Sequence, residues 1–134
     1  MLRVGALLVV MVGSAAAAPK PGDLIDVAAE IPDAVIDIRY ATKDNFTNTV
    51  LYPVARCKLR RAVVERLVKA AAALRKRDRR LLIWDCYRPL SIQKALWKKV
   101  PDPRYVADPA TGSKHNRGAA IDLAIVDKAG KPVT

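Results

Sequence analysis

The sequence predicts an α+β domain in which two helices pack against a small antiparallel sheet. Runs of apolar residues, alternating or continuous, indicate strands near Ala34–Tyr40, Leu81–Trp84 and Ala119–Val126. Apolar residues at helical spacing indicate one helix from Leu59 to about Lys76 and a second from Ile92 to about Lys99. A length of 134 residues allows one domain of this kind.

The first eighteen residues are expected to be a secretory signal peptide that is removed from the mature protein. Arg3 gives a positive start, Val4–Val12 is almost entirely apolar, and Ser14–Ala18 is a run of small residues. The apolar stretch is too short to span a bilayer comfortably. Cleavage after Ala17 or Ala18 fits this pattern, and we favour Ala17. We therefore expect a periplasmic or secreted protein with no membrane span after cleavage. The alternative is a buried N-terminal helix.

Residues 19–32 are expected to be a leader, and residues 33–134 form the domain itself. In the first predicted strand, Ile38 and Tyr40 fall on one side, because side chains alternate along a strand. The polar segment Thr42–Tyr52 shows little apolar periodicity and is expected to be a loop.

Positive charge is concentrated in the predicted long helix and its flanks. The formal net charge is +11, and residues 56–80 hold eleven Lys and Arg side chains against two acids. Leu59, Leu67 and Leu74 fit helical spacing, so one face of the helix belongs to the core and the charges occupy the other. The helix lacks the aromatic residues that would stack on bases, so we expect no nucleic-acid partner. The charged face is expected to meet solvent or anionic polymers of the envelope.

The chain has two cysteines, Cys57 and Cys86. An even number in an exported chain favours a disulfide. The bond would close a loop of roughly 30 residues and would stabilise the fold by about 3–4 kcal/mol in the chain-entropy model. The alternative is a pair of buried free thiols.

A short motif, Asp-Cys-Tyr-Arg-Pro at residues 85–89, follows the second predicted strand. Pro89 cannot donate a hydrogen bond to a sheet and biases Arg88 toward an extended conformation, so the strand is expected to end here. Ser91 is then expected to cap the second helix.

The only histidine of the chain lies in residues 113–122, whose sequence is Ser-Lys-His-Asn-Arg-Gly-Ala-Ala-Ile-Asp. A neutral imidazole and a carboxylate are good ligands for a divalent metal such as zinc, which makes His115 and Asp122 candidate ligands. Gly118 suits a turn between them. On the strand that follows, Asp122 shares a face with two alanines, which leave room for an ion. The alternative is an ordinary hydrogen-bonded pair of histidine and aspartate.

Three segments of the chain resemble one family of bacterial peptidases. The pattern Ser-x-His-x-x-Gly-x-Ala-x-Asp at residues 113–122 is similar to the signature of zinc peptidases that cut D-alanyl-D-alanine bonds in cell-wall material. Residues 40–47 resemble that family's Tyr-Ala-Thr-x-x-Asn-Phe-Thr segment and residues 85–89 its Asp-x-Tyr-Arg-Pro segment, which narrows the match to the D-alanyl-D-alanine dipeptidases. The resemblance covers about residues 33–130 and implies a zinc D,D-peptidase-like fold whose C-terminal part is missing from this sequence.

The resemblance implies a metal site and a group that stabilises the transition state. His115 and Asp122 would hold one zinc ion per chain, which lowers the pKa of a bound water and polarises the scissile carbonyl. Arg88 would stabilise the tetrahedral transition state, because a guanidinium offers forked donors to a developing oxyanion. Asp85 would orient Arg88 by a charge-assisted hydrogen bond.

Two further residues, Tyr40 and Ser113, resemble residues beside the bound dipeptide in that family. Each of these side chains also has a purely structural alternative. Arg88 is compatible with a surface ion pair, Tyr40 with a half-buried strand position, and Ser113 with a turn.

The activity that the resemblance implies is zinc-dependent hydrolysis of D-alanyl-D-alanine to two D-alanines, in cell-wall metabolism or glycopeptide resistance. In that family a Glu-x-x-His motif supplies the third zinc ligand and the catalytic base. This sequence contains neither, since its only glutamates are Glu30 and Glu65 and no histidine lies three residues beyond either. We therefore expect an incomplete copy of the enzyme, whether a fragment, a truncated gene product or a degenerate paralogue.

Two alternative functions remain open. One is a D,D-carboxypeptidase that trims longer peptidoglycan peptides, and the other is a non-catalytic protein that binds the envelope. A Glu-x-x-His motif in frame beyond Thr134 would support the enzyme, and a true stop would support the binding protein. The sequence leaves the oligomeric state open.

Overall fold

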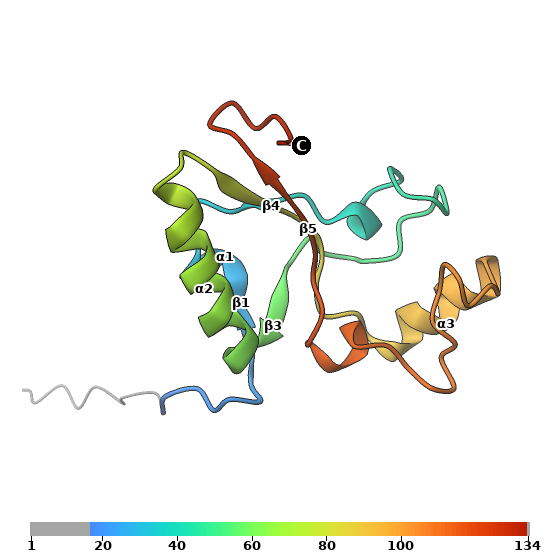
Figure 1. Cartoon of the computed structure of the whole chain (residues 1–134). Helices are drawn as coiled ribbons and strands as arrows, with labels where there is room; N and C mark the ends of the chain where they lie inside the picture. The colour runs from blue at the N-terminus through green and yellow to red at the C-terminus, as the bar shows by residue number, and fades with distance from the viewer. Residues whose placement is uncertain (1–16, 134) are drawn as a thin grey trace, which may run out of the picture.

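The computed structural model describes residues 17–133 of the chain (Figure 1). All but the last two residues of the predicted signal peptide, residues 1–18, lie outside this described part, so that prediction is not tested. Among the described residues, no helix combines the length and the apolar character that a membrane span requires.

Within residues 17–133, three α-helices and two small sheets give a mixed α+β architecture, which confirms the predicted class. In chain order the elements are β1 (Leu24–Asp26), α1 (Val27–Glu30), β2 (Val35–Ile36), the 3-10 turn η1 (Arg39–Ala41), β3 (Lys58–Arg60), α2 (Arg61–Arg75), β4 (Arg80–Asp85), α3 (Leu90–Lys99), the 3-10 turn η2 (His115–Arg117) and β5 (Asp122–Val126). The larger sheet has the strand order β2-β4-β5, and β1 pairs with β3 in a separate sheet.

The larger sheet is mixed, so the prediction of an antiparallel sheet was wrong for β2. β4 pairs with β5 in antiparallel fashion, but β2 runs parallel to β4, with Ile36 opposite Ile83. A parallel pair requires a crossover connection. The chain between β2 and β4 provides it, since this segment includes β3 and the fifteen-residue helix α2. Side-chain alternation along a strand carries no information about the direction of its neighbour.

The first predicted strand is much shorter in the structure, because its second half forms a turn. Only two residues form β2, and Tyr40 lies in η1. Side-chain bonds that compete with a sheet hold this turn. The Thr42 hydroxyl donates to the Arg39 carbonyl at 3.1 Å, and the Asn45 amide donates to the Thr42 carbonyl at 2.7 Å.

Helix α2 packs against β4 and β3 (Figure 1). It starts two residues later than predicted, because Leu59 belongs to β3 and pairs with Ile25 of β1. Val64, Leu67 and Ala71 are buried on its inner face. The charged residues lie on the opposite face, as an amphipathic helix requires.

The second predicted helix is α3, which begins directly after Pro89. Pro89 has the extended conformation of a residue that precedes a helix, with ψ of 146°, and occupies the N-cap position. Ser91 is therefore the second residue of the helix and not its cap, so that prediction was wrong. In Figure 1, α3 lies apart from the larger sheet, beyond the end of β4, so only α2 fulfils the expectation of helices packed on the sheet.

The core lies between α2 and the two sheets. Ile31, Leu59 and Ile83 are fully buried in it. Cys57 and Cys86, also buried, are joined by a disulfide. This bond connects the residue before β3 to the residue after β4, and so ties the smaller sheet to the larger one.

Candidate functional site

Three segments meet at one end of the larger sheet: the end of β4, the start of β5 and the turn η2. Asp85 is the last residue of β4 and Asp122 is the first of β5. A register shift between Ile83 and Asp85 places the two aspartates opposite each other. Breaks in strand register, such as β-bulges, change the direction of side chains and are common next to functional sites.

Gly118 lets the chain reverse between His115 and Asp122. Its φ of 63° lies in the left-handed region that favours glycine. A Cβ added here would lie 2.6 Å from Leu24 Cδ2, and the Gly118 carbonyl accepts a hydrogen bond from the Arg60 amide at 3.0 Å. The turn therefore packs directly on the smaller sheet, and this contact sets the position of His115.

The imidazole of His115 is held between a backbone carbonyl and a carboxylate. Its Nδ1 lies 2.8 Å from the Cys86 carbonyl oxygen, and its Nε2 lies 3.6 Å from Asp122 Oδ1. Since a carbonyl only accepts, we assign the proton of the neutral ring to Nδ1, which donates to Cys86. The Nε2 lone pair then faces Asp122. A metal-ligating histidine with an outer hydrogen-bond partner has this arrangement.

Opposing influences act on the pKa of His115 in the metal-free chain. Burial of the imidazole lowers its pKa, but the Asp122 carboxylate and the Cys86 carbonyl stabilise the charged ring more, so the pKa is raised above 6.5. His115 in turn lowers the pKa of Asp122 below 3.8, against the smaller opposing effect of burial. Without metal, the two residues form an ion pair at mildly acidic pH.

The spacing of His115 and Asp122 fits a zinc ion. Two bonds of about 2.0–2.1 Å at a tetrahedral angle place their ligand atoms roughly 3.3 Å apart. This value is close to the 3.6 Å between Nε2 and Oδ1. The imidazole is 14% exposed and the Asp122 side chain 54% exposed, so the site is packed on the histidine side and open on the aspartate side.

Asp85 completes a group of three potential ligands whose atoms lie within 4.8 Å of one another. Both of its oxygens are already engaged. Oδ1 accepts from the Tyr52 hydroxyl at 2.7 Å and from the Cys86 amide at 2.9 Å, and Oδ2 accepts two bonds from Arg88. Within the described part of the chain, His115 and Asp122 are thus the members of this group with free ligand atoms, and Asp85 anchors Arg88.

Arg88 is buried beside this site, with 7% of its surface exposed. Its Nε and Nη2 donate to Asp85 Oδ2 at 3.1 and 2.5 Å, and its Nη1 donates to the Gln93 side chain at 2.8 Å. Burial lowers the pKa of Arg88, but the Asp85 carboxylate opposes this effect and the pKa is raised. A guanidinium has five N–H donors, and these contacts use three, so two remain for a ligand.

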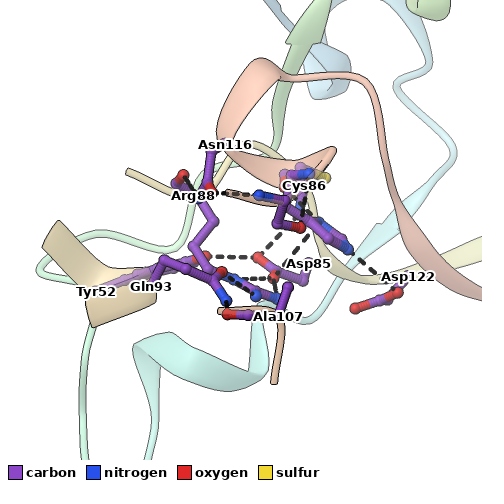
Figure 2. A network of polar contacts seen from close by, with 10 residues as sticks. Tyr52, Asp85, Cys86, Arg88, Gln93, Ala107, Asn116 and Asp122 are labelled. Carbon is purple, nitrogen blue, oxygen red and sulfur yellow. Dashed lines mark hydrogen bonds and ion pairs between the residues drawn. The ribbon is translucent and has the colours of Figure 1, made fainter. Parts of the chain in front are cut away.

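Tyr52 and Gln93 are side chains of this network that the sequence did not indicate (Figure 2). Tyr52 donates to Asp85, and its pKa is raised by burial and then by the Asp85 charge. Gln93 is fully buried, and its Nε2 donates to the Ala107 carbonyl at 2.6 Å. A signal existed for Gln93, a polar residue that shares the inner face of a helix with an apolar one three positions later. Tyr52 ends a polar loop and offers no such signal.

Tyr40 borders a pocket of about 540 Å³, which Asp85 and Asp122 also line. The centre of the Tyr40 ring lies 5.3 Å from the Arg88 guanidinium carbon and 6.1 Å from the ring centre of Phe46. Burial raises the pKa of Tyr40, so its hydroxyl stays protonated and can donate a hydrogen bond. The volume is in the range of small-molecule sites.

Ser113 takes a different place. Its hydroxyl accepts from the His115 amide at 3.2 Å, and its own amide donates to Asn116 Oδ1 at 2.7 Å. It lines a separate surface pocket with Gly112 and Asn116. The structure thus brings five of the predicted residues together and places Ser113 in the turn beside them. These five are Tyr40, Asp85, Arg88, His115 and Asp122.

Comparison with known proteins supports the resemblance found in the sequence. A family profile described as D-ala-D-ala dipeptidase matches residues 20–134. The chain is also 41% identical over 108 residues to the D-alanyl-D-alanine dipeptidase of Escherichia coli, and the alignment covers 81% of this chain and 56% of that relative. The chain therefore spans little more than half the length of this relative. Because the family match extends over most of the chain, the protein belongs to the D-ala-D-ala dipeptidase family.

Proposed function

We propose that the protein hydrolyses the dipeptide D-alanyl-D-alanine to two D-alanines in a zinc-dependent reaction, in the periplasm or outside the cell. The observation that carries this proposal is the convergence of the His115–Asp122 pair and the anchored guanidinium of Arg88 at one end of the sheet. Membership of the family supports the choice of reaction. The Escherichia coli relative is named for this activity, but the chain spans only 56% of it, so the activity remains a proposal for this protein.

His115 and Asp122 are the residues that would hold the zinc ion. When bound, zinc supplies a water of lowered pKa and polarises the scissile carbonyl. Catalytic zinc sites normally use three protein ligands, and a general base must accept the proton of the water. Glu30 and Glu65 lie elsewhere, 3.8 and 3.0 Å from the Arg61 guanidinium. We propose that the third ligand and the base come from residues outside the printed sequence.

Arg88 is proposed to stabilise the negative charge that develops on the oxygen of the scissile carbonyl. Its two remaining N–H donors are held in place by the contacts with Asp85 and Gln93, so little reorganisation is needed at the moment of reaction. Burial places this charge in a medium of low dielectric, which strengthens its effect. The Tyr40 hydroxyl is proposed to contact the dipeptide in the pocket. Ser113 remains a proposed contact on the basis of its place in the family signature alone.

The test is D-alanine release from D-alanyl-D-alanine by the protein in the length in which its organism makes it, with and without zinc. His115→Ala should abolish turnover. Arg88→Ala should lower kcat by about 10²–10³-fold, the usual cost of removing an oxyanion donor. Arg66→Ala, which changes an exposed arginine of α2, is the matched control and should keep full activity. An active His115→Ala variant would disprove the metal site, and an unaffected Arg88→Ala variant would disprove the oxyanion role.

A second candidate is a D,D-carboxypeptidase that trims longer peptidoglycan peptides. The exposure of Asp122 favours it, because an open side leaves room for a longer substrate. The two activities differ in the ratio of kcat/KM for the free dipeptide to that for a pentapeptide ending in D-Ala-D-Ala. The dipeptidase proposal expects the dipeptide to be cleaved far faster, and the reverse preference would assign a carboxypeptidase. Cleavage of neither substrate would favour a non-catalytic envelope-binding protein.

A further inference from the structure

We propose that the Cys57–Cys86 disulfide positions His115 for metal binding, so that a chain without this bond binds zinc more weakly. This inference rests on the zinc site of the proposed function. The observation that carries it is that one residue, Cys86, both forms the disulfide and supplies the carbonyl that orients the imidazole.

The backbone of Cys86 holds two parts of the site at once. Its carbonyl accepts from His115 Nδ1 at 2.8 Å, and its amide donates to Asp85 Oδ1 at 2.9 Å. A shift of Cys86 would therefore turn the imidazole and would also release one bond of the carboxylate that anchors Arg88. Because Cys86 follows the last residue of β4, strand pairing holds the residue before it but not the residue after it.

The other end of the disulfide, Cys57, directly precedes β3 of the smaller sheet. The Cys57 carbonyl accepts from the Val27 amide at 2.9 Å, and the next residue, Lys58, accepts from the Tyr87 amide at 2.9 Å. The covalent bond thus joins the residue before β3 to the segment after β4, and the hydrogen bond joins the first residue of β3 to the same segment.

The short strand β3 also supports the turn that carries His115. At the end of β3, the Arg60 amide donates to the Gly118 carbonyl at 3.0 Å and Arg60 Nε donates to the Arg117 carbonyl at 2.5 Å. One end of β3 therefore holds the carbonyl partner of His115 through the disulfide, and the other end holds the turn η2. Without the disulfide, Cys86 and η2 lose a common rigid support, and the imidazole loses its fixed orientation.

Loss of the fixed orientation of the imidazole is expected to lower the zinc affinity. The outer hydrogen-bond partner of a metal-ligating histidine fixes both the tautomer and the direction of the ring. Here the bond to Cys86 keeps the proton on Nδ1 and leaves Nε2 free for the metal. Removal of outer partners typically lowers metal affinity by about 10–100-fold. We expect a change of this size although neither cysteine contacts the metal.

The experiment measures the zinc affinity of the whole chain by competition with a chromophoric chelator. The test variant is Cys57→Ser/Cys86→Ser, because free thiols would bind zinc themselves and would mask the effect. Val64→Ala is the matched control, since it removes buried side-chain volume from α2 and lowers stability without touching the site. The His115→Ala variant measures how much zinc binds at other places on the chain. The competition is measured at a temperature at which circular dichroism shows all variants to be folded.

The proposal expects the double serine variant to bind zinc about 10-fold or more weakly, and Val64→Ala to bind as the wild type does. Equal affinity of the double serine variant and the wild type would overturn it, and so would an equal loss in Val64→Ala, which would show a general effect of stability. Absence of any His115-dependent zinc binding in the wild type would disprove the proposed metal site itself.

If the wild type shows no His115-dependent zinc binding, amide hydrogen exchange tests without metal whether the disulfide positions His115. The Arg88 amide donates to the His115 carbonyl at 3.0 Å and so reports contact between the end of β4 and η2. Its exchange should be faster in the double serine variant, while the amides between β4 and β5 keep their protection. Unchanged exchange at Arg88 would overturn the proposal.

Discussion

The side chain of Gln93 connects Arg88 to the backbone at Ala107, in the loop that precedes residues 113–122. Gln93→Leu would leave Arg88 Nη1 and the Ala107 carbonyl without partners in a buried region. Each unsatisfied buried group typically costs about 1–3 kcal/mol. We expect a loss of free energy of unfolding of that order, measured by urea denaturation. Gln93→Glu should lose less, because it keeps an acceptor for Arg88.

Ser91→Ala is the control for this experiment, because Ser91 lies exposed on the same helix. Surface changes of this kind usually alter stability by no more than about 0.5 kcal/mol. If Gln93→Leu were as stable as Ser91→Ala, the buried network would not contribute to the fold.

Zinc should stabilise the chain through His115. A ligand that binds only the folded state raises the free energy of unfolding by about 2.7 kcal/mol at a concentration of 100 times its Kd. We expect zinc to raise the Tm of the wild type and excess chelator to reverse the shift. His115→Ala should show no shift, and Asp122→Asn a reduced one, because an amide is a weaker ligand than a carboxylate. An equal shift in all three proteins would place the metal elsewhere.

The site residues could be predicted from the sequence where both partners of a contact lie close together in the chain. Asp85 and Arg88 are three residues apart, and His115 and Asp122 are seven apart, so a short motif contains both members of each pair. Tyr52 reaches Asp85 across 33 residues of chain, and no local pattern indicates such a contact. The link from His115 to Cys86 was missed for the same reason, since a backbone carbonyl acceptor leaves no mark in the sequence.

Gly118 joins η2 to β5 and packs on the smaller sheet. Gly118→Ala would place a side chain in the left-handed region, which costs about 1–2 kcal/mol, and would also press the new Cβ against Leu24. Gly130 is a matched control, because its φ is +81° and a Cβ added there meets nothing within 4 Å. We expect Gly118→Ala to lose more stability than Gly130→Ala and also to lose zinc affinity. Equal losses would mean that the close approach is relieved without strain.

The ion pair between Asp33 and Arg75 ties the end of α2 to the segment before β2. Two bonds of 2.8 and 2.5 Å lower the pKa of Asp33 below 3.8. A carboxyl whose pKa is lowered on folding stabilises the fold above its unfolded value, and this stabilisation is lost as pH falls through the folded pKa. Asp33→Asn should therefore be slightly less stable than the wild type above pH 4, and the difference should vanish in stronger acid.

Urea unfolding of both proteins across this pH range measures the effect. The loss is expected to be small, because both side chains are partly exposed to solvent. Val63, a partly buried residue of α2 that packs against the core, provides the control, because Val63→Ala removes no charge and should lower the stability equally at each pH. A difference between Asp33→Asn and the wild type that stayed constant into strong acid would contradict the linkage.

The elements themselves were predicted best where a long pattern specified them. The strand β4 and the helix α2 stand close to their predicted bounds, since each is a continuous apolar or periodic segment. The predicted end of the first strand was wrong, because hydrogen bonds from the side chains of Thr42 and Asn45 form a turn there. The alternation of apolar residues gave no indication of this turn. Leu59 fitted the helical spacing as well as a strand, and only its pairing with β1 decided between them.

The site depends on contacts between the two sheets that no single sequence motif contains. The disulfide and β3 hold η2 and the end of β4 together, although Cys57 and Gly118 are far apart in the chain. The sequence predicted which residue types gather at the site through the family resemblance. The arrangement that makes them act together is tertiary, and it follows from the pairing of β1 with β3 and of β4 with β5.

The chain of 134 residues should bind zinc without releasing D-alanine from D-alanyl-D-alanine. The described residues offer free ligand atoms from His115 and Asp122, whereas a catalytic zinc normally has three protein ligands. Glu30 and Glu65 pair with Arg61 on α1 and α2, away from the pocket, so neither can accept the proton of a water at the site. General base catalysis alone contributes typically about 10²–10⁴-fold.

The measurement is D-alanine release by the purified chain with zinc, compared with a zinc-free blank and with His115→Ala. We expect all three to be indistinguishable, although zinc binding to the wild type is detectable by chelator competition. Turnover that zinc restores and His115→Ala abolishes would contradict this expectation. It would show that the base and the third ligand are already present in the chain. Asp85 would then be the first residue to test, because it offers a ligand atom within 4.8 Å of those of His115 and Asp122.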